Sequence, residues 1–186
     1  MPTPSIVDAN YRFISASQEV NSRIAHRQQA LTLYVSLTVS LLAALVALKP
    51  GADGQLPVEW LVLGFPVASM CLAFLNYKTE RAITHLRHFM SELERLGNAH
   101  EYLPSYNTNP KWAMGANKAR RFQDYASAVL VAGGNAIGLG AVIKIYPERM
   151  AENPMAIWIT ALVAIASLVG LLLIPKMSYK PHQVEG

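Results

Sequence analysis

Four long apolar stretches constrain this chain more than any other feature of its sequence. Each is close to the roughly 20 residues that a helix needs to cross the hydrocarbon core of a bilayer, at about 1.5 Å of rise per residue. We therefore predict an all-α integral membrane protein with four transmembrane helices, and lipid bilayer as its first partner. The stretches are Ala30–Leu48, Val58–Leu75, Tyr125–Ile143 and Met155–Pro175.

The composition agrees with a membrane environment. Of the 186 residues, 52% are hydrophobic and 15% are charged, whereas a soluble domain carries about 25% charged residues. Four helices that are apolar on all sides could not be buried in one small soluble domain, because too little polar sequence remains to cover them. The first apolar stretch follows a long polar segment, so we expect it to act as an uncleaved insertion signal.

The distribution of basic residues predicts how the chain is threaded. The chain has 16 Lys and Arg residues, and all but three lie before span one, between spans two and three, or after span four. Because cytoplasmic segments collect Lys and Arg, we place both termini and the central segment in the cytoplasm of a bacterial inner membrane. The exceptions are Lys49, Lys144 and Arg149.

This threading divides the chain into two hairpins with cytoplasmic extensions. No breaker separates the N-terminal segment from span one, so we expect one helix from about Asn10 to Leu48. Span two should run on to a stop at Gly97-Asn98, with a kink at Pro66. The predicted parts are a cytoplasmic amphipathic helix (1–29), a first transmembrane hairpin (30–75), a cytoplasmic helix and loop (76–121), a second transmembrane hairpin (122–175) and a cytoplasmic tail (176–186).

The stretch after span two carries an apolar seam. Its spacing of 4, 3, 4 and 3 residues is that of the a and d positions of a heptad repeat. The seam either packs on the first helix of the same chain, forming a cytoplasmic stalk, or joins two copies or a partner, and the sequence leaves these alternatives open. The seam residues are Ala82, Leu86, Phe89, Leu93 and Leu96.

Two sets of small or polar residues lie within the spans. In span three, Gly134 and Gly138 are four residues apart around Asn135. Such spacing lets helices approach closely in lipid, and a mid-bilayer amide needs a hydrogen-bond partner. In span one, Thr32, Ser36 and Ser40 repeat every four residues on one face. We interpret both sets as helix-packing residues, with pore lining as the alternative.

Several residues are predicted to contact lipid headgroups. Tryptophan and basic side chains concentrate where a span meets the membrane surface. The central loop also interleaves aromatic residues with lysines, which permits a nucleotide ligand as an alternative to headgroups. The predicted headgroup residues are Trp60, Lys118, Arg120, Arg121 and Trp158.

No motif for catalysis, metal or cofactor binding is recognisable, so we expect none of these. One short pattern is a possible exception: Arg81 and His88 are spaced as R-x6-H. This pattern resembles the signature of HEPN-type ribonucleases, and membrane-embedded accessory proteins of RNA-targeting CRISPR systems are similar in joining such a motif to transmembrane helices. The resemblance covers eight residues, and Ala82 stands where the family has a polar residue. It implies a membrane-bound ribonuclease accessory protein.

The absence of a charged residue deep in any span argues against ion-coupled transport. We therefore expect a non-enzymatic, self-associating membrane protein that forms or regulates a pore, or perturbs the membrane, in response to a cytoplasmic cue. Small multi-span effectors of bacterial anti-phage systems share this plan. The alternatives are a scaffold that recruits a cytosolic protein through the stalk and the ribonuclease accessory protein. A nucleic-acid partner is not expected, because topology accounts for the basic excess.

Overall fold

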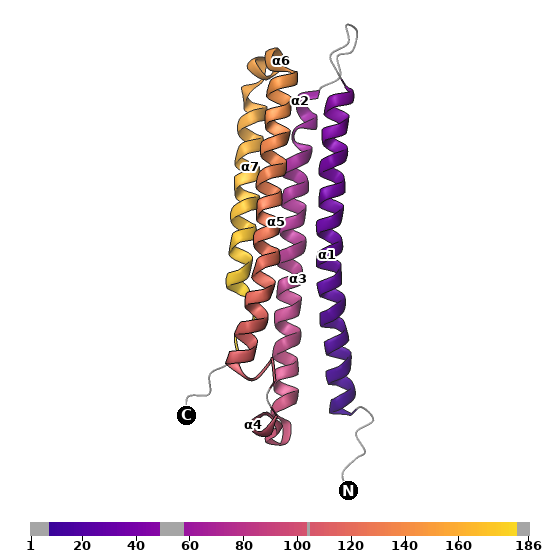
Figure 1. Ribbon diagram of the computed structural model, residues 1–186, viewed down its shortest axis with the longest axis vertical. Coiled ribbons are helices and arrows are strands. Elements are labelled where there is room, and N and C mark those ends of the chain that lie inside the picture. The colour runs from indigo at the N-terminus through magenta and orange to yellow at the C-terminus, as the bar shows by residue number, and fades with distance from the viewer. Residues whose placement is uncertain (1–7, 49–57, 104, 182–186) are drawn as a thin grey trace.

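The computed structural model describes residues 8–48, 58–103 and 105–181, which are helical and contain no strand. Four long helices lie side by side as a bundle (Figure 1): α1 (Ala9–Ala47), α3 (Gly64–Arg95), α5 (Pro110–Ile145) and α7 (Pro154–Leu173). Short helices connect or extend them: α2 (Val58–Leu61), η1 (Leu96–Asn98), α4 (Ala99–Tyr102), α6 (Pro147–Glu152) and η2 (Ile174–Met177).

The all-helical class is confirmed. Within the described residues, three helical segments are long and apolar enough to cross a membrane: Ala9–Ala47, Pro110–Ile145 and Pro154–Met177. The second predicted span, Val58–Leu75, is divided between α2 and α3. The structure therefore supports the prediction of a membrane protein with transmembrane helices.

The expectation of an unbroken helix through span two, kinked at Pro66, is wrong. The helix is interrupted at Val62-Leu63, and Pro66 lies in the first turn of α3. Proline lacks the N–H that would bond to the carbonyl four residues earlier, and its ring clashes with that carbonyl, which here belongs to Val62. In a first turn this missing donor costs nothing, because the first N–H groups of a helix have no intrahelical partner.

The ends of the long helices follow local sequence signals. The Asp8 side chain accepts a hydrogen bond from the Asn10 backbone N–H and caps α1, and Asn109 caps α5 in the same way ahead of Pro110. Asn98 adopts a left-handed conformation, with φ 57°, which helps to end the helical run after α3. The predicted single helix from about Asn10 and the stop at Gly97-Asn98 are thus confirmed to within two residues.

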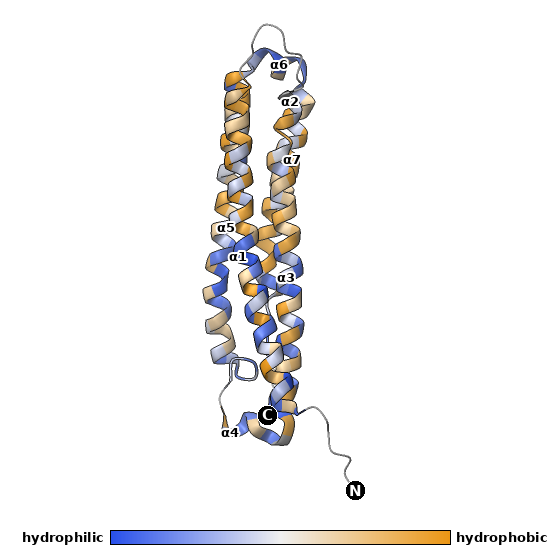
Figure 2. Ribbon diagram, turned by 90° about the vertical axis from the view of Figure 1, so that its right-hand side faces the viewer, coloured by the Kyte–Doolittle hydropathy of each residue, from blue (hydrophilic) through white to orange (hydrophobic). Residues whose placement is uncertain are grey.

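The helices form an antiparallel up-and-down bundle. α3 packs against α1 and α7, and α5 packs against α7 and α1. α7 ends partway down the bundle, whereas α1, α3 and α5 continue beyond it (Figure 1). The half of the bundle that includes α7 is predominantly apolar, and polar residues concentrate in the extension (Figure 2). The start of α1 and the end of α7 point towards this same polar end.

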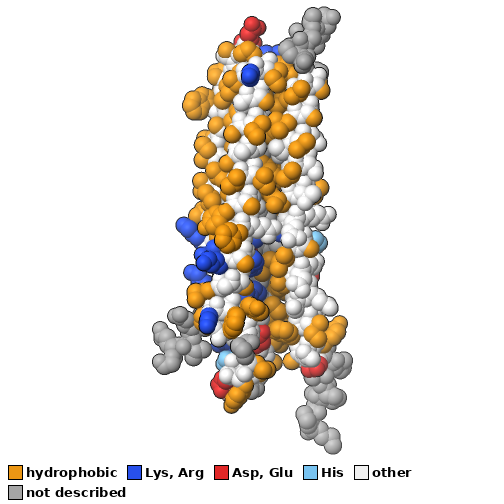
Figure 3. Space-filling view, in the orientation of Figure 1, with side chains coloured by type: hydrophobic (Ala, Val, Ile, Leu, Met, Phe, Trp, Pro, Cys, Tyr) orange, Lys and Arg blue, Asp and Glu red, His pale blue; other side chains and the backbone are white. Residues whose placement is uncertain are grey.

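The outside of the apolar half is covered with large hydrophobic side chains. These lie on all four long helices and form a broad apolar belt (Figure 3). Both tryptophans predicted to be anchors are exposed, Trp60 at 62% and Trp158 at 75%. Such a continuous apolar surface exceeds what soluble monomers tolerate. Representative exposed residues are Leu33, Val39, Phe74, Val129, Ile137, Leu162 and Ile165.

Candidate functional site

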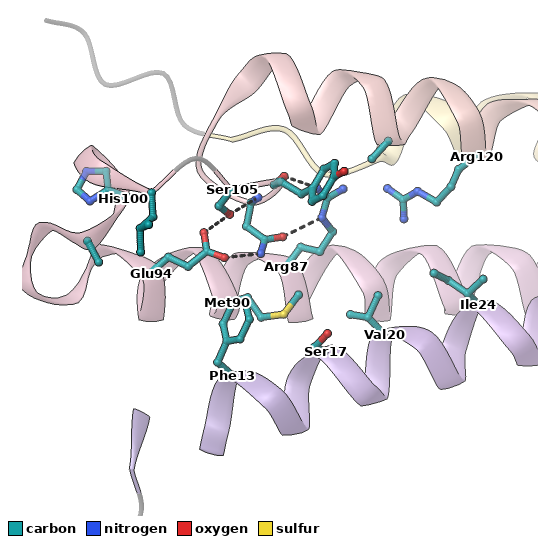
Figure 4. Close-up of a pocket in the computed structure, with 15 residues that line it drawn as sticks. Phe13, Ser17, Val20, Ile24, Arg87, Met90, Glu94, His100, Ser105 and Arg120 are labelled. Atoms are coloured by element: carbon teal, nitrogen blue, oxygen red, sulfur yellow. Dashed lines mark hydrogen bonds between the residues drawn. The ribbon is translucent and has the colours of Figure 1, made fainter. Parts of the chain in front are cut away.

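A cavity of about 640 Å³ lies in the polar half of the bundle, between α1 and the other helices. The part of α1 in this polar half supplies one apolar wall, including Phe13, Val20 and Ile24. The opposite wall comes from α3, α4, the 105–109 loop and α5, and it contains the charged side chains of Arg87 and Arg120 (Figure 4). The cavity is therefore mostly apolar, with cationic groups on one side.

Arg87 organises the wall opposite α1. Arg87 is 5% exposed, and its guanidinium donates to Asn107 Oδ1 at 3.2 Å, to Asn117 Oδ1 at 3.0 Å and to the carbonyl oxygen of Tyr106. It also lies 4.8 Å from the centre of the Tyr179 ring. One side chain on α3 thus fastens the central loop, α5 and the chain after α7 together.

Neutral oxygen atoms accept the hydrogen bonds of the charged Arg87 guanidinium. The pKa of Arg87 is lowered to about 10, mainly by burial and also by the nearby Arg120, while Tyr179, Glu80 and Glu94 oppose the change. The side chain still carries its charge at neutral pH. Glu94 accepts hydrogen bonds from Asn107 Nδ2, at 2.8 Å, and from Ser105. The cavity wall therefore carries two guanidinium groups and one engaged carboxylate.

A cluster of buried charges lies where the apolar half meets the polar half. Arg27 of α1 pairs with Glu80 of α3 at 3.3 Å and with Asp124 of α5, and all three side chains are at most 3% exposed. Arg120 lies 3.8 Å from Glu80. Burial is the main cause that lowers the pKa of Arg27, and Glu80 opposes it. We refer to Arg27, Glu80 and Asp124 as the charged triad.

The structure places the predicted packing residues of span three inside the bundle. A Cβ at Gly134 would lie 2.9 Å from the Tyr34 hydroxyl, and one at Gly138 would lie 2.9 Å from the Phe65 ring. Asn135 is buried and donates to Ser69 Oγ at 2.7 Å and to the Val131 carbonyl at 2.8 Å. These residues therefore lie at close contacts of α5 with α1 and α3.

The hydroxyl stripe of span one lies on the opposite side. Thr32, Ser36 and Ser40 are exposed on the outer face of α1. Thr32 bonds to the Gln28 carbonyl at 3.2 Å and Ser40 bonds to the Ser36 carbonyl at 2.9 Å. The two predicted sets thus face inward and outward, and they cannot line one conduit within a single chain.

The predicted seam lies beside the buried face of α3 rather than on it. The most buried positions there include Ile83, Arg87 and Met90, each one residue after a seam position. Phe89 is 43% exposed and Leu96 is 58% exposed. Leu86 and Phe89 contribute to a second hollow, of about 600 Å³, against α1. The half-buried seam residues are Ala82, Leu86 and Leu93.

The predicted headgroup residues separate into two groups. Trp60, Trp158, Lys118 and Arg121 are exposed. Arg120 points inward, where it bonds to Asn117 Oδ1 at 2.6 Å in addition to approaching the triad. The expectation that Arg120 meets lipid therefore does not fit its position, because α5 presents adjacent residues to different faces.

The R-x6-H residues are engaged within the chain. Arg81 donates to the Tyr77 hydroxyl at 3.1 Å, and His88 packs edge-on against the Tyr179 ring with centroids 4.7 Å apart. Across residues 8–48, 58–103 and 105–181, no three His, Cys, Asp or Glu side chains gather as a metal site. The ribonuclease interpretation stays a prediction.

The sequence did not indicate the charged triad or the role of Arg87. Arg27 and Asp124 each stand just before an apolar stretch, and Glu80 follows one closely. Residues of opposite charge at the same ends of apolar stretches would lie at the same depth in neighbouring helices, and this pattern could predict an ion pair inside the bundle. No protein-family model, curated protein or solved structure matches the chain.

Proposed function

We propose that the chain is a four-span inner-membrane protein whose cytoplasmic half binds a small amphipathic anion and transmits that binding to self-association in the membrane. Predicted span two, which is not among the three long apolar helical segments, is α2 together with the apolar first part of α3. α3 packs against α1 and α7 over the height at which those helices are apolar (Figure 2). A bilayer around α1 and α7 would therefore also surround this segment of α3. Lipid tolerates a packed helix there, whereas it does not tolerate backbone N–H and C=O groups that are left unpaired.

The cavity is the observation that carries the functional part of this proposal. Its apolar wall on α1 suits a hydrocarbon or aromatic body, and Arg120, whose side chain is 18% exposed, suits an acidic group on the opposite wall, near the positive charge of Arg87. Binding sites of this size commonly combine apolar lining with a few oriented polar groups. A charge-assisted bond to a guanidinium is also among the stronger polar contacts available.

α1 provides a direct route from the cavity to the membrane. It runs without interruption from Phe13 and Val20 at the cavity to the exposed stripe of Thr32, Ser36 and Ser40. A ligand that changes the separation of α1 from α3 would move the stripe with it, because a continuous helix transmits displacement along its length. Exposed hydroxyls on a lipid-facing helix are suited to contacts between copies of the chain.

Binding of dodecanoate to the protein in nanodiscs tests the ligand site. We expect dodecanoate to raise the apparent Tm of the wild type, and decyltrimethylammonium, which has the opposite charge, to have little effect. Val20→Trp fills the cavity and should abolish the response. Asn21→Trp, on the exposed side of the same turn, should retain it. Equal responses to both amphiphiles in both variants would show simple partitioning into the nanodisc and remove the proposal.

Ion leak from loaded liposomes tests the membrane output. We expect leak to rise at high protein density when dodecanoate is present and to fall in a Thr32→Leu, Ser36→Leu, Ser40→Leu variant. The matched control is Ala132→Leu with Ala136→Leu, which adds leucine side chains at exposed positions of α5 instead of α1 and should leave the leak unchanged. Leak that is identical with and without dodecanoate would exclude a dodecanoate-dependent pore. The binding assay would still test separately whether the cavity binds dodecanoate.

A scaffold is the second candidate, and the hollow beside Leu86 and Phe89 favours it. This hollow lies on the cytoplasmic part of α1 and α3, where an apolar helix of a cytosolic partner could pack. A pull-down from cell extract distinguishes the two functions. One stoichiometric cytosolic protein that is lost with Phe89→Glu supports the scaffold, and its absence favours the ligand-responsive protein.

A further inference from the structure

A second, more basic cavity lies on another face of the molecule. It has a volume of about 1130 Å³ and is formed between the cytoplasmic part of α5 and the chain that follows α7. Two of its cations, Lys118 and Arg121, are one turn apart on α5, and the other two, Lys176 and Lys180, lie beyond α7. Four cations from two separate segments therefore surround one hollow.

These cations have no counterion within the described chain. None of the four forms an ion pair with a carboxylate among residues 8–48, 58–103 and 105–181, and no Asp or Glu lines the hollow. Like charges that converge without an anion repel one another. Arg27 and Arg120, by contrast, are paired with carboxylates inside the bundle. The positive charge of the hollow is therefore not balanced by any carboxylate among the described residues.

The segment that carries Lys176 and Lys180 is held in place by buried contacts. Tyr179 is 1% exposed, its backbone carbonyl accepts from Asn117 Nδ2 at 2.6 Å, and its hydroxyl donates to the Asn107 carbonyl at 2.6 Å. The cations flank this anchored tyrosine. Their convergence is therefore a consequence of the fold, which positions Lys180 opposite α5 instead of leaving it on a free tail.

The location of the hollow identifies its occupant. Pro175, where the last apolar stretch ends, lines it, and the basic side chains gather directly below the apolar belt (Figure 3). Phe122 and Met177, which follow the lining residues Arg121 and Lys176 in the chain, are exposed at 68% and 49%. A ligand that joins a phosphate to long hydrocarbon chains matches both surroundings. Basic pockets at the cytoplasmic boundary of transmembrane helices are suited to such headgroups.

We infer that this hollow binds the phosphate headgroup of an anionic phospholipid of the cytoplasmic leaflet, held by Lys118, Arg121, Lys176 and Lys180. The inference rests on the membrane placement proposed above but is independent of the amphipathic cavity. A lipid at this position would bridge α5 and the chain after α7. It would also neutralise the cations that the fold brings together.

Native mass spectrometry of delipidated full-length protein tests the inference. Phosphatidylglycerol should bind with higher affinity than phosphatidylcholine, and this preference should decrease as salt is raised. Replacing Lys176 and Lys180 by Gln should weaken binding about tenfold, since each cation near a membrane surface contributes on the order of a fivefold effect before screening. Lys118→Gln with Arg121→Gln should do the same.

A matched variant and a soluble probe make the result decisive. Lys78→Gln with Arg12→Gln removes two exposed cytoplasmic-side cations that do not line the hollow, and it should leave the lipid preference unchanged. An equal loss in this variant would show a nonspecific effect of net charge and overturn the site. Inorganic phosphate that binds as tightly as the lipid would assign the hollow to a soluble ligand instead. A wild-type protein that shows no preference for phosphatidylglycerol but keeps its dodecanoate response would refute this inference alone.

Discussion

Replacing Arg27 by Met should strongly destabilise the protein, because buried Asp124 loses its ion-pair partner and buried Glu80 keeps only the more distant Arg120. Glu80 and Asp124 are each 2% exposed, and Arg27 is their shared partner. Removing one member of a buried ion pair typically costs about 3–5 kcal/mol. At roughly 2–4 °C per kcal/mol for a chain of this length, the apparent Tm should fall by about 6–20 °C.

The exposed ion pair on the same helix provides the control. Arg23 and Glu19 lie one turn earlier, with side chains 36% and 43% exposed. An exposed i, i+4 pair contributes about 0.3–0.5 kcal/mol, so Arg23→Met should lower the apparent Tm by at most ~2 °C. Both variants are to be compared by thermal unfolding in one detergent. Equal shifts for Arg23→Met and Arg27→Met would refute the argument from burial.

A third variant separates stranded charge from lost packing. Combining Arg27→Met with Glu80→Gln and Asp124→Asn removes the carboxylate charges while nearly preserving side-chain shape. Since the uncompensated charges cause most of the expected cost, this variant should regain most of the lost Tm. A triple variant no more stable than Arg27→Met would mean that the arginine acts through its packing, as long side chains can.

Three further predictions follow from single contacts. Gly138→Ala should destabilise the protein by about 1–3 kcal/mol, because the added Cβ would lie 2.9 Å from the Phe65 ring. The loss is measured as a lower apparent Tm. Gly133→Ala, whose Cβ would have nothing within 4 Å, should be neutral or slightly stabilising. Arg87→Ala should release the central loop and the segment around Tyr179, seen as faster limited proteolysis at residues 103–109 with α1 still protected; cleavage unchanged from wild type would contradict its fastening role. Replacing Arg81 and His88 by Ala should leave cellular RNA profiles unaltered, because both side chains have partners within the chain. A changed profile would support the ribonuclease interpretation.

The prediction of Tm loss at Gly138 also bears on how span three works. If Gly138→Ala unfolds as the wild type does while self-association is lost, the glycine acts between chains. Loss of Tm without a change in oligomeric size places it within the bundle, as its 2.9 Å approach to Phe65 indicates. Sizing both glycine variants in one detergent distinguishes these outcomes.

The sequence by itself determined the helical class and most helix limits. The start of α1 after Asp8, the start of α5 at Pro110 and the stop near Asn98 depend on capping and proline chemistry within a few residues. The apolar stretches likewise fixed which parts can meet lipid, because hydrocarbon burial is a property of a segment's own side chains. Pro66 by itself predicts a kink within span two, whereas the helix is interrupted at Val62-Leu63 and Pro66 lies in the first turn of α3.

Only the tertiary structure decided which face of α3 is buried and which partners its charged side chains have. The apolar spacing favoured Leu86 and Phe89, yet the buried face includes Arg87, because neutral acceptors from distant segments satisfy its charge. Likewise, Arg27 can be buried only because Glu80, 53 residues away, lies opposite it. Whether a charged side chain is buried depends on partners that local patterns do not contain. The two cavities exist for the same reason, since each is enclosed by segments that meet only in the folded bundle.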